Sequence, residues 1–322
     1  MRVCVLSDEV LEEFNPGPFL KDHEWEMLTL QAPVLEIIQT AAEQNKYDVY
    51  LNMCEGYEDV DESELEYGGI DVIEALERLN LPYTGANPKF FDPSREEMQA
   101  VADANGIGFA KGYQVRSVEE AEQLVADLRF PIMVKHPKSY GSTGMFKESR
   151  TDTLEQMKRQ VERVCAEFGA ARMEEFIVGR EFNVLLVENP DDNSEPFAYP
   201  PMEVIFPKGE EFWHVDVKWD YSLALEFRQV VEEPLAIRLQ DITRRLFLAL
   251  NGVGYGRTDI RMNEQGELFV LEINPNSGFM YMPEQFGPAD YMILYDKDGY
   301  MGFFDRIFRS AILRQKIRAM AR

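Results

Sequence analysis

The chain has 322 residues, 45% of them hydrophobic and 12% aromatic, which suffices for two or three globular domains and excludes a disordered polypeptide. Its 33 basic and 58 acidic residues give a formal charge of −25. That balance excludes proteins that hold nucleic acid through a basic face, whereas a small anionic ligand needs only a few converging cations.

Residues 1 to 92 have the pattern of a small α/β domain. Strands are predicted at Val3–Leu6 and Asp48–Asn52, and helices are predicted near Ala32–Glu43 and at Gly69–Leu79. Strands that alternate with helices predict a parallel sheet covered by helices. The mostly acidic segment Glu58–Glu66 is expected to form a loop at the open end of that sheet.

In residues 93 to 170 the pattern restarts, and we expect a second domain there. Ser94 is expected to cap a helix at Arg95–Asn105, because Glu97 three residues later completes a capping box. A strand, a helix, a strand and a final helix are then predicted, at Gly112–Arg116, Val118–Leu128, Phe130–Lys135 and Thr153–Phe168.

Residues 171 to 322 form the expected third domain, which ends in a predicted helix at Gly302–Arg322. Two of its β-rich runs, Arg257–Met262 and Glu267–Asn274, are joined by four polar residues that end in Gly266. Such a short polar connection with a terminal glycine predicts a β-hairpin.

The register of this hairpin decides which side chains converge. If Met262 pairs with Glu267, Arg257 lies opposite Glu272 and Asp259 lies opposite Val270. Side chains alternate along a strand, and cross-strand partners share a face. One face is then expected to collect Arg257, Asp259, Glu272 and Asn274, and the other Ile260, Phe269, Leu271 and Ile273.

Two carboxylates and an amide oxygen on one face predict a metal site. They are the hard oxygen ligands that Mg²⁺ prefers when phosphate oxygens complete its shell. The neighbouring Arg257 is suited to stabilise charge that develops during acyl or phosphoryl transfer. The alternative is a structural hairpin with one solvated polar face, which is common in antiparallel sheets.

Two further segments have the chemistry of a nucleotide site. Lys135 ends an apolar strand just before the small-residue loop Ser139–Gly144, and free N–H groups of such a loop can hold phosphates. The segment Glu174–Glu181 joins two strand-like runs and offers carboxylates to ribose hydroxyls or an adenine amino group. The alternative for the loop Ser139–Gly144 is a plain turn, and the alternative for Glu174–Glu181 is a surface turn. The sequence contains neither the GxxxxGK[ST] motif nor a GxGxxG motif after a strand.

Together these pieces resemble the D-alanine–D-alanine ligase group of the ATP-grasp superfamily along most of the chain. Their order and spacing fit the family, which is more specific than any single piece. The matching pieces are Leu81-Pro-Tyr-Thr-Gly85, Val134-Lys135, Gly141-Ser-Thr-Gly144, Glu175-Phe-Ile-Val-Gly-Arg-Glu181, Gly254-Tyr-Gly-Arg-Thr-Asp259 and Leu271-Glu-Ile-Asn274.

The resemblance implies a mixed α/β ATP-grasp fold of three domains, with a parallel N-terminal α/β domain and ATP between two antiparallel sheets. It implies an ATP site formed by Arg95, Lys135, Gly141, Ser142, Thr143, Glu174, Glu175, Ile177, Glu181 and Lys218. It implies two Mg²⁺ ions, with Mn²⁺ as an alternative, on Asp259, Glu272 and Asn274. The catalytic residues that it implies are Arg257, Lys218 and Ser142.

The segments that would bind the amino-acid substrates depart from the family pattern. Leu11–Gly17 stands where the family has a glycine-rich loop with a serine and a glutamate that holds the first substrate's amine. Pro283 and Glu284 stand where a Ser–Leu pair holds the second substrate's carboxylate, and proline offers neither a hydroxyl nor an N–H. Trp219 also replaces a tyrosine beside Lys218. We therefore expect an altered substrate pocket.

The expected activity is that of an ATP-dependent carboxylate–amine ligase, which forms an amide or peptide bond through an acyl phosphate and releases ADP and phosphate. Its expected partners are ATP and small amino-acid or peptide substrates, and not nucleic acid. The alternatives are an ATP-grasp ligase that modifies a peptide or protein, and a nucleotide-binding regulator without catalysis.

The chain has no predicted targeting or membrane segment. It lacks a charged-then-apolar leader and any run of 18 apolar residues, so we expect a cytoplasmic protein without a membrane partner. The family analogy also implies a homodimer through the N-terminal domain.

Overall fold

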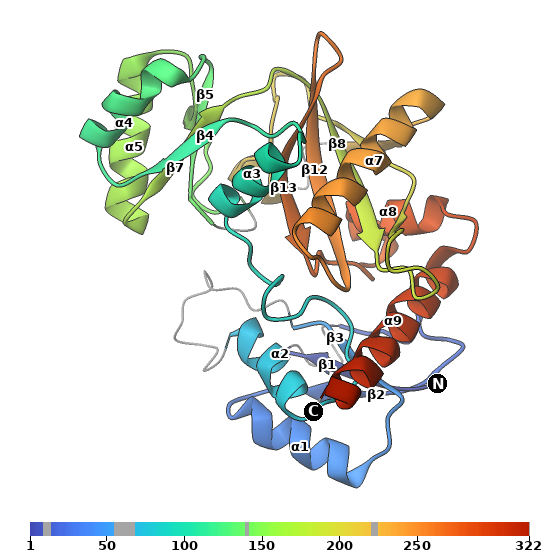
Figure 1. The fold of residues 1–322 in the computed structure, drawn as a ribbon. Coiled ribbons are helices and arrows are strands. Elements are labelled where there is room, and N and C mark those ends of the chain that lie inside the picture. Colours follow the sequence, from blue (N-terminus) through green and yellow to red (C-terminus); the bar gives the residue numbers. More distant parts are fainter. Residues whose placement is uncertain (9–13, 55–67, 139–141, 220–224, 322) are drawn as a thin grey trace.

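The computed structural model describes residues 1–8, 14–54, 68–138, 142–219 and 225–321. Its strands form one parallel and two mainly antiparallel sheets (Figure 1), as the mixed α/β prediction requires. The acidic loop Glu58–Glu66, the first part of the loop Ser139–Gly144 with Gly141, and the first part of Leu11–Gly17 lie outside the described residues.

The first sheet is parallel, with the strand order β2-β1-β3. Its strands and the helices after them are β1 (Arg2–Ser7), β2 (Glu24–Thr29), α1 (Val34–Gln44), β3 (Val49–Asn52) and α2 (Gly69–Arg78). The sequence analysis missed β2. This edge strand is only partly buried and alternates acidic with apolar residues, so it lacks the apolar run of its neighbours.

The alternation of side chains along β1 gives this sheet two buried faces. Cys4 and Leu6 pack with α1 and α2, whereas Val3 and Val5 pack with α9 (Gly299–Ala321). Figure 1 shows α9 returning from the C-terminal part of the chain to this N-terminal sheet. The last helix therefore joins the two ends of the sequence in one core.

The second sheet is antiparallel, with the order β4-β7-β5-β6. Helices α4 and α5 pack on it, and α3 precedes it with the predicted cap, since Ser94 Oγ accepts from the N–H of Glu97 at 3.2 Å. The strand β7 begins directly after the predicted domain boundary at residue 170, and that boundary stays a prediction. The elements are α3 (Arg95–Ala104), β4 (Gly112–Val115), α4 (Val118–Leu124), η1 (Val125–Asp127), β5 (Ile132–Lys135), η2 (Lys147–Ser149), β6 (Arg150–Thr151), α5 (Leu154–Phe168) and β7 (Ala171–Glu175).

The third sheet has the order β11-β10-β8-β12-β13, with β9 paired to β8. Its strands are β8 (Gly179–Val187), β9 (Phe197–Ala198), β10 (Met202–Ile205), β11 (Glu226–Gln229), β12 (Tyr255–Asn263) and β13 (Leu268–Pro275). The helices of this part are α6 (Val215–Trp219), α7 (Glu233–Ala249), η3 (Pro283–Gln285), α8 (Pro288–Tyr295) and α9.

The central strand β8 shows how the third sheet separates apolar from polar side chains. Phe182, Val184 and Leu186 pack with α7 and α3 in one core. Glu181 and Asn183 alternate with them and therefore lie on the opposite face, although both are almost fully buried. The sheet thus holds buried polar groups that need partners.

The hairpin of β12 and β13 forms as predicted, but its predicted register is wrong. Met262 pairs with Leu268 instead of Glu267, because the connection spans one residue more than expected. The N–H of Asn263 donates to the carbonyl of Glu267 at 3.0 Å and closes this longer turn.

A second irregularity, between Asp259 and Ile260, shifts the pairing by one more residue. Arg257 therefore lies opposite Asn274, and Asp259 lies opposite Glu272. The two shifts together move the register by two positions, so the polar face is preserved. Beside this bulge, however, the side chains of β13 change the face of the sheet on which they lie. Val270 faces the core with Ile260, whereas Leu271, which was expected there, lines a cavity.

Two glycines hold the start of β12 against the N-terminal part. Gly254 has a φ of +75°, and its Cα lies so close to the carbonyl of Gly85 that an added Cβ would be 2.2 Å from that oxygen. Arg314 of α9 donates to the same carbonyl at 2.9 Å and pairs with Glu188 at 3.1 Å. This contact fixes the strand that carries Arg257.

The close approach at Gly254 predicts a large loss of stability in Gly254→Ala. Gly266→Ala is a matched control, because Gly266 has a similar φ of +77° but no atom within 4 Å of an added Cβ. The control should lose about 1 kcal/mol through backbone strain alone, and Gly254→Ala should lose at least about 2 kcal/mol more. Urea unfolding measures both, and equal losses would contradict the contact.

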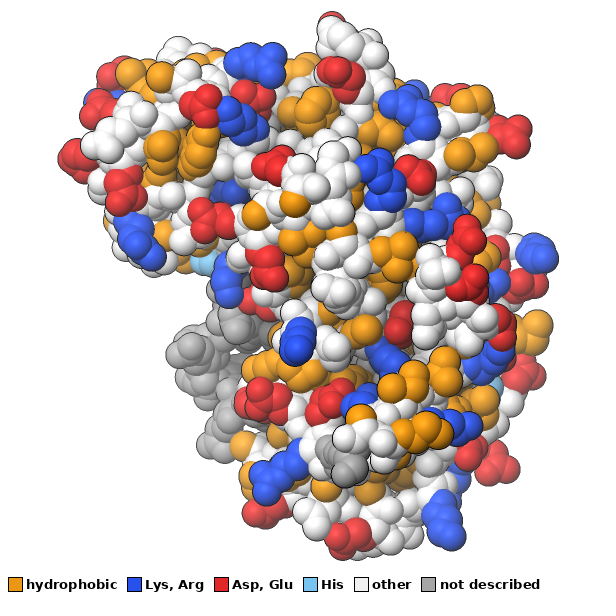
Figure 2. All heavy atoms as spheres, viewed as in Figure 1, with side chains coloured by type: hydrophobic (Ala, Val, Ile, Leu, Met, Phe, Trp, Pro, Cys, Tyr) orange, Lys and Arg blue, Asp and Glu red, His pale blue; other side chains and the backbone are white. Residues whose placement is uncertain are grey.

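The surface has mixed charge on the face shown in Figure 2, where basic side chains lie scattered among acidic ones. Among the residues that the structure describes, no helix is long and apolar enough to cross a bilayer.

Candidate active site

The second and third sheets border a cavity of about 620 Å³. That volume falls in the range of about 300–1,000 Å³ that is usual for ligand pockets. Most residues expected at the nucleotide and metal sites line it, namely Arg95, Lys135, Ser142, Glu174, Glu175, Ile177, Glu181, Lys218, Arg257, Asp259, Glu272 and Asn274. Thr143 is not among the lining residues, and Gly141 lies outside the described part of the chain.

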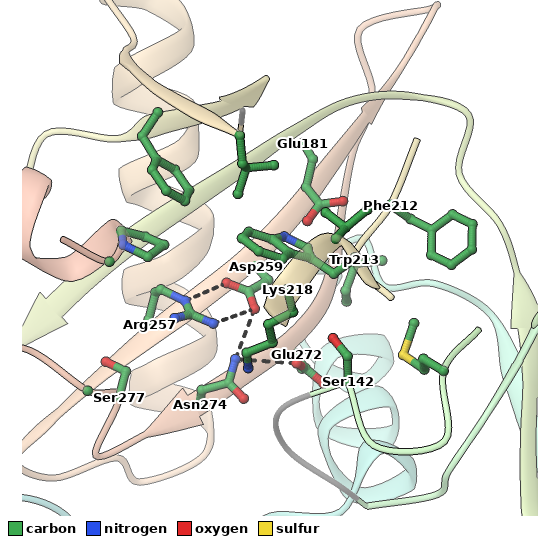
Figure 3. A pocket seen from close by; sticks show the side chains of 18 of the residues that line it. Ser142, Glu181, Phe212, Trp213, Lys218, Arg257, Asp259, Glu272, Asn274 and Ser277 are labelled. Atoms are coloured by element: carbon green, nitrogen blue, oxygen red, sulfur yellow. Dashed lines mark hydrogen bonds and ion pairs between the residues drawn. The ribbon is translucent and has the colours of Figure 1, made fainter. Parts of the chain in front are cut away.

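Asp259 is the centre of the hairpin side of the cavity. Arg257 donates to its two oxygens from Nε and Nη2 at 2.8 and 3.0 Å, as Figure 3 shows. The amide groups of Asn183 and Asn274 donate to the same carboxylate at 2.6 and 3.0 Å. These bonds hold the Arg257 guanidinium in one orientation at the cavity wall.

Glu272 lies beside Asp259 on the same face. Arg95 donates to one of its oxygens from Nη2, and Asn274 Nδ2 donates to the other at 3.4 Å. Burial would raise the pKa of this carboxyl, but Arg95, Lys135 and Arg257 outweigh burial and lower the pKa to about 2. Glu272 is therefore an ionised carboxylate at neutral pH.

These residues fit a magnesium ion only in part. Asp259 and Glu272 supply carboxylate oxygens, and Asn274 keeps its amide oxygen available because its Nδ2 donates to both carboxylates. Within the described ranges, no three His, Cys, Asp or Glu side chains gather as a metal site. The set therefore suits Mg²⁺ when a ligand's phosphate oxygens and water complete the shell.

Glu174 is the centre of the charges on the second sheet. Lys135 Nζ lies 2.5 Å from one of its oxygens, and Arg172 Nε donates to the other at 2.6 Å. All three side chains are at least nine-tenths buried. Burial would raise the pKa of Glu174, but Lys135 and Arg172 together lower it.

Glu181 on β8 lies directly opposite Arg261 on β12. Arg261 donates to Glu181 from Nε and to the carbonyl of Ile177, in both cases at 2.8 Å. Its guanidinium also lies 4.4 Å from the ring centroid of Phe176. Burial raises the pKa of Glu181, and the charge of Arg261 partly offsets this effect. Glu181 also accepts a hydrogen bond from Trp213.

Comparisons with known proteins identify the family. The family model described as D-ala D-ala ligase C-terminus matches residues 101–284, which is more than half of the chain. The chain belongs to this family. It is 27% identical over 251 residues to a D-alanine–D-alanine ligase of Oceanobacillus iheyensis, a match that covers 75% of this chain and 64% of the relative. The chain thus spans less than two thirds of the length of the curated relatives it matches.

Solved structures of D-alanine–D-alanine ligases have the same fold. The enzyme of Coxiella burnetii has a TM-score of 0.70 at 15% identity, over 100% of this chain and 96% of that chain. The enzyme of Bacillus anthracis complexed with ATP has a TM-score of 0.66 at 16% identity, over 98% of this chain and 99% of that chain. The predicted ATP-grasp fold is therefore confirmed.

In this D-alanine–D-alanine ligase family member, three residues of the cavity region were missed by the sequence analysis. Arg261 and Arg172 each lie two positions from a predicted residue, Asp259 and Glu174 respectively, so strand alternation could have indicated them. Trp213 lies between strands and has no such signal, because only the folded chain brings it to Glu181.

The family member's cavity is closed on one side by residues 281 to 288, and Asp290 holds both ends of this segment. Asp290 is fully buried and accepts from the N–H groups of Met280 and Gly287 at 2.8 and 2.9 Å. The hydroxyl of Tyr300 also donates to it. Burial raises the pKa of Asp290 from 3.8 to about 6, although these hydrogen bonds lower it.

This raised pKa predicts how stability depends on pH. Between the two pKa values the unfolded chain ionises Asp290 while the folded protein keeps it protonated, so its contribution to stability falls as pH rises. Relative to Asp290→Asn, the wild-type free energy of unfolding should fall by up to about 3 kcal/mol from about pH 4 to about pH 7. Urea unfolding across this range measures the difference. The substitution of exposed Asp103 by Asn is the control, and parallel profiles for wild type and Asp290→Asn would contradict the prediction.

Proposed function

We propose that this chain is an ATP-dependent carboxylate–amine ligase. The observation that carries the proposal is the cavity between two sheets, in which paired cations lie beside the oxygen set of Asp259, Glu272 and Asn274. Among the described residues, five basic and six acidic side chains line this cavity. The cavity is therefore close to neutral in a chain of formal charge −25, and its cations can meet a triphosphate.

The cavity offers separate surfaces to the base, the ribose and the phosphates of ATP. Met133, Phe176 and Phe212 form an apolar cluster next to Glu174, which suits a purine ring and its amino group. Glu181 is the acceptor for the ribose hydroxyls. The phosphates are assigned to Lys135, Lys218, Arg95 and Ser142, because all four line the same cavity. A D-alanine–D-alanine ligase of Bacillus anthracis with the same fold has been solved in complex with ATP, which supports an ATP site in this fold.

Two Mg²⁺ ions, with Mn²⁺ as an alternative, would be held by Asp259, Glu272, Asn274 and the phosphates. Such ions neutralise the charge of the transferring phosphoryl group. The low pKa of Glu272 supports this role, because the ligand must be ionised at neutral pH.

The reaction begins when an oxygen of the substrate carboxylate attacks the γ-phosphorus of ATP. ADP leaves, and an acyl phosphate remains. The amine then attacks the carbonyl carbon, loses a proton and expels phosphate, which leaves an amide. The protein contributes position and charge. Arg257 stabilises the oxyanion of the tetrahedral intermediate, and Asp259 orients its guanidinium for this task.

The proposed activity is tested by incubating the full chain with ATP, Mg²⁺ and pools of amino acids, small peptides and amines. We expect release of phosphate that depends on the pool, and a product whose mass equals that of the two substrates less one water. Phosphate release only with a peptide or protein acceptor would favour a ligase that modifies such chains. ATP binding without phosphate release under every condition would overturn the ligase and leave a nucleotide-binding regulator.

The proposed metal ligands Asp259 and Glu272 can be tested separately. Asp259→Asn and Glu272→Gln remove the carboxylate charges, so each should lower the rate of phosphate release by about 100-fold or more. The control is Asp241→Asn, which changes the same kind of side chain at a position that is 61% exposed on α7. Steady-state phosphate release at several Mg²⁺ concentrations measures the effect. Full activity in both site variants would exclude the hairpin as the metal site.

A further inference from the structure

One wall of the cavity is a continuous row of aromatic rings. Trp213 and Phe227 stack with ring centroids 6.2 Å apart, and Phe227 lies 5.6 Å from Tyr291. Tyr291 then meets the ring of Phe286 edge-on at 5.7 Å. All four rings line the cavity and stay partly exposed. Their free faces are therefore available to a ligand.

The row ends at the segment of residues 281 to 288, which carries a single charge. Glu284 lines the cavity, its side chain is exposed, and it forms no hydrogen bond or ion pair with any described residue. Its neighbour Pro283 has no N–H to donate. The charged group that this segment offers to a ligand is thus a carboxylate.

The segment that carries Glu284 contributes no positive charge to the cavity. From Pro275 to Asp296 the sequence contains no lysine, arginine or histidine. Arg257 has an electrostatic interaction with Tyr281, the first residue of the segment 281 to 288. Its Nε and Nη2 are already bound to Asp259 at 2.8 and 3.0 Å. A ligand carboxylate placed beside Glu284 would meet a like charge.

A carboxylate beside aromatic faces is the chemistry that recognises an ammonium or a guanidinium group. We propose that the amine acceptor of this enzyme is a diamine-like cation without a carboxylate: its reacting amine faces Arg257, and its distal cation lies between Glu284 and the aromatic row. This inference rests on the proposed function, because it names the acceptor for the same site.

Pairs of compounds that differ by one carboxylate test this acceptor class. Cadaverine is compared with 5-aminopentanoate, and putrescine with 4-aminobutyrate, so that in each pair a carboxylate replaces the distal amine; binding is measured by titration calorimetry on the full chain with Mg²⁺ and a non-hydrolysable ATP analogue. Because a carboxylate would be repelled by Glu284, each amine should bind about tenfold or more tightly than its amino acid. Equal or tighter binding of the amino acids, or no binding of either amine at millimolar concentration, would overturn the proposal.

Charge variants at Glu284 identify the group responsible. Glu284→Gln should weaken amine binding about tenfold, and Glu284→Lys should reverse the preference toward the amino acids. Glu264→Gln is the matched control, because Glu264 is an exposed glutamate in the turn of the hairpin and does not line the cavity. An unchanged preference in Glu284→Lys would show that Glu284 does not select the acceptor.

Binding is measured without turnover, so the two ideas can fail separately. If these amines bind as expected but no pool releases phosphate, the ligase activity is wrong while the cation-binding end stands. If phosphate is released with amino acids as acceptors and the amines do not bind, the ligase activity stands while the acceptor class is wrong.

Discussion

Buried charge is the constraint on which this structure depends. The strand β12 carries Arg257, Asp259 and Arg261 along its polar face, between its neighbours β8 and β13. An unpaired charge in such a place costs several kcal/mol, so each needs a partner of opposite sign with matching hydrogen bonds. Arg257 and Asp259 pair with each other within β12, and Arg261 pairs with Glu181 of β8. The register of the central strands is therefore tied to the arrangement of the charges.

The same pairs explain how the cavity is prepared for a charged ligand. Four of its cations, Arg95, Lys135, Arg257 and Arg261, are held in fixed directions by carboxylates, so a ligand that binds them meets side chains with little freedom left to lose. Lys135 is held by Glu174 on the second sheet, and Arg95 is held by Glu272 on the third. In the proposed ligase, these fixed cations would stabilise the charge that develops on the reacting carbonyl during acyl transfer.

The two ends of the cavity have different chemistry, and this difference follows from where their residues lie in the chain. The polar end is formed by strands, which fix side chains at regular spacing. The other end is formed by residues 281 to 288, which are tied down by Asp290 on α8 and by Tyr300 on α9. A connecting segment of this kind can change composition without disturbing the sheet.

Strand periodicity predicted much of the site because it is local. The period of two placed Arg257, Asp259, Glu272 and Asn274 on one face, and this survived an error in register because the two displacements amounted to two positions. The same rule failed at Leu271, since a bulge depends on how β12 fits its neighbours and has no signature in the hairpin's own sequence. The edge strand β2 was missed for a related reason. Its sequence lacks the apolar run typical of a strand in such a sheet, and it forms a strand by pairing with β1.

The sequence by itself determined most elements of residues 1 to 170, the hairpin, its polar face and the family likeness of the nucleotide side, because each depends on residues close together in the chain. Only the tertiary structure decided which cation meets which carboxylate. Arg172 reaches Glu174 within one strand, but Arg95 reaches Glu272 across 177 positions of sequence. Only the structure, likewise, set the aromatic row beside Glu284. Apart from the Arg172–Glu174 pair, those contacts join separate elements, and their geometry is fixed by the packing of sheets and helices rather than by any local pattern.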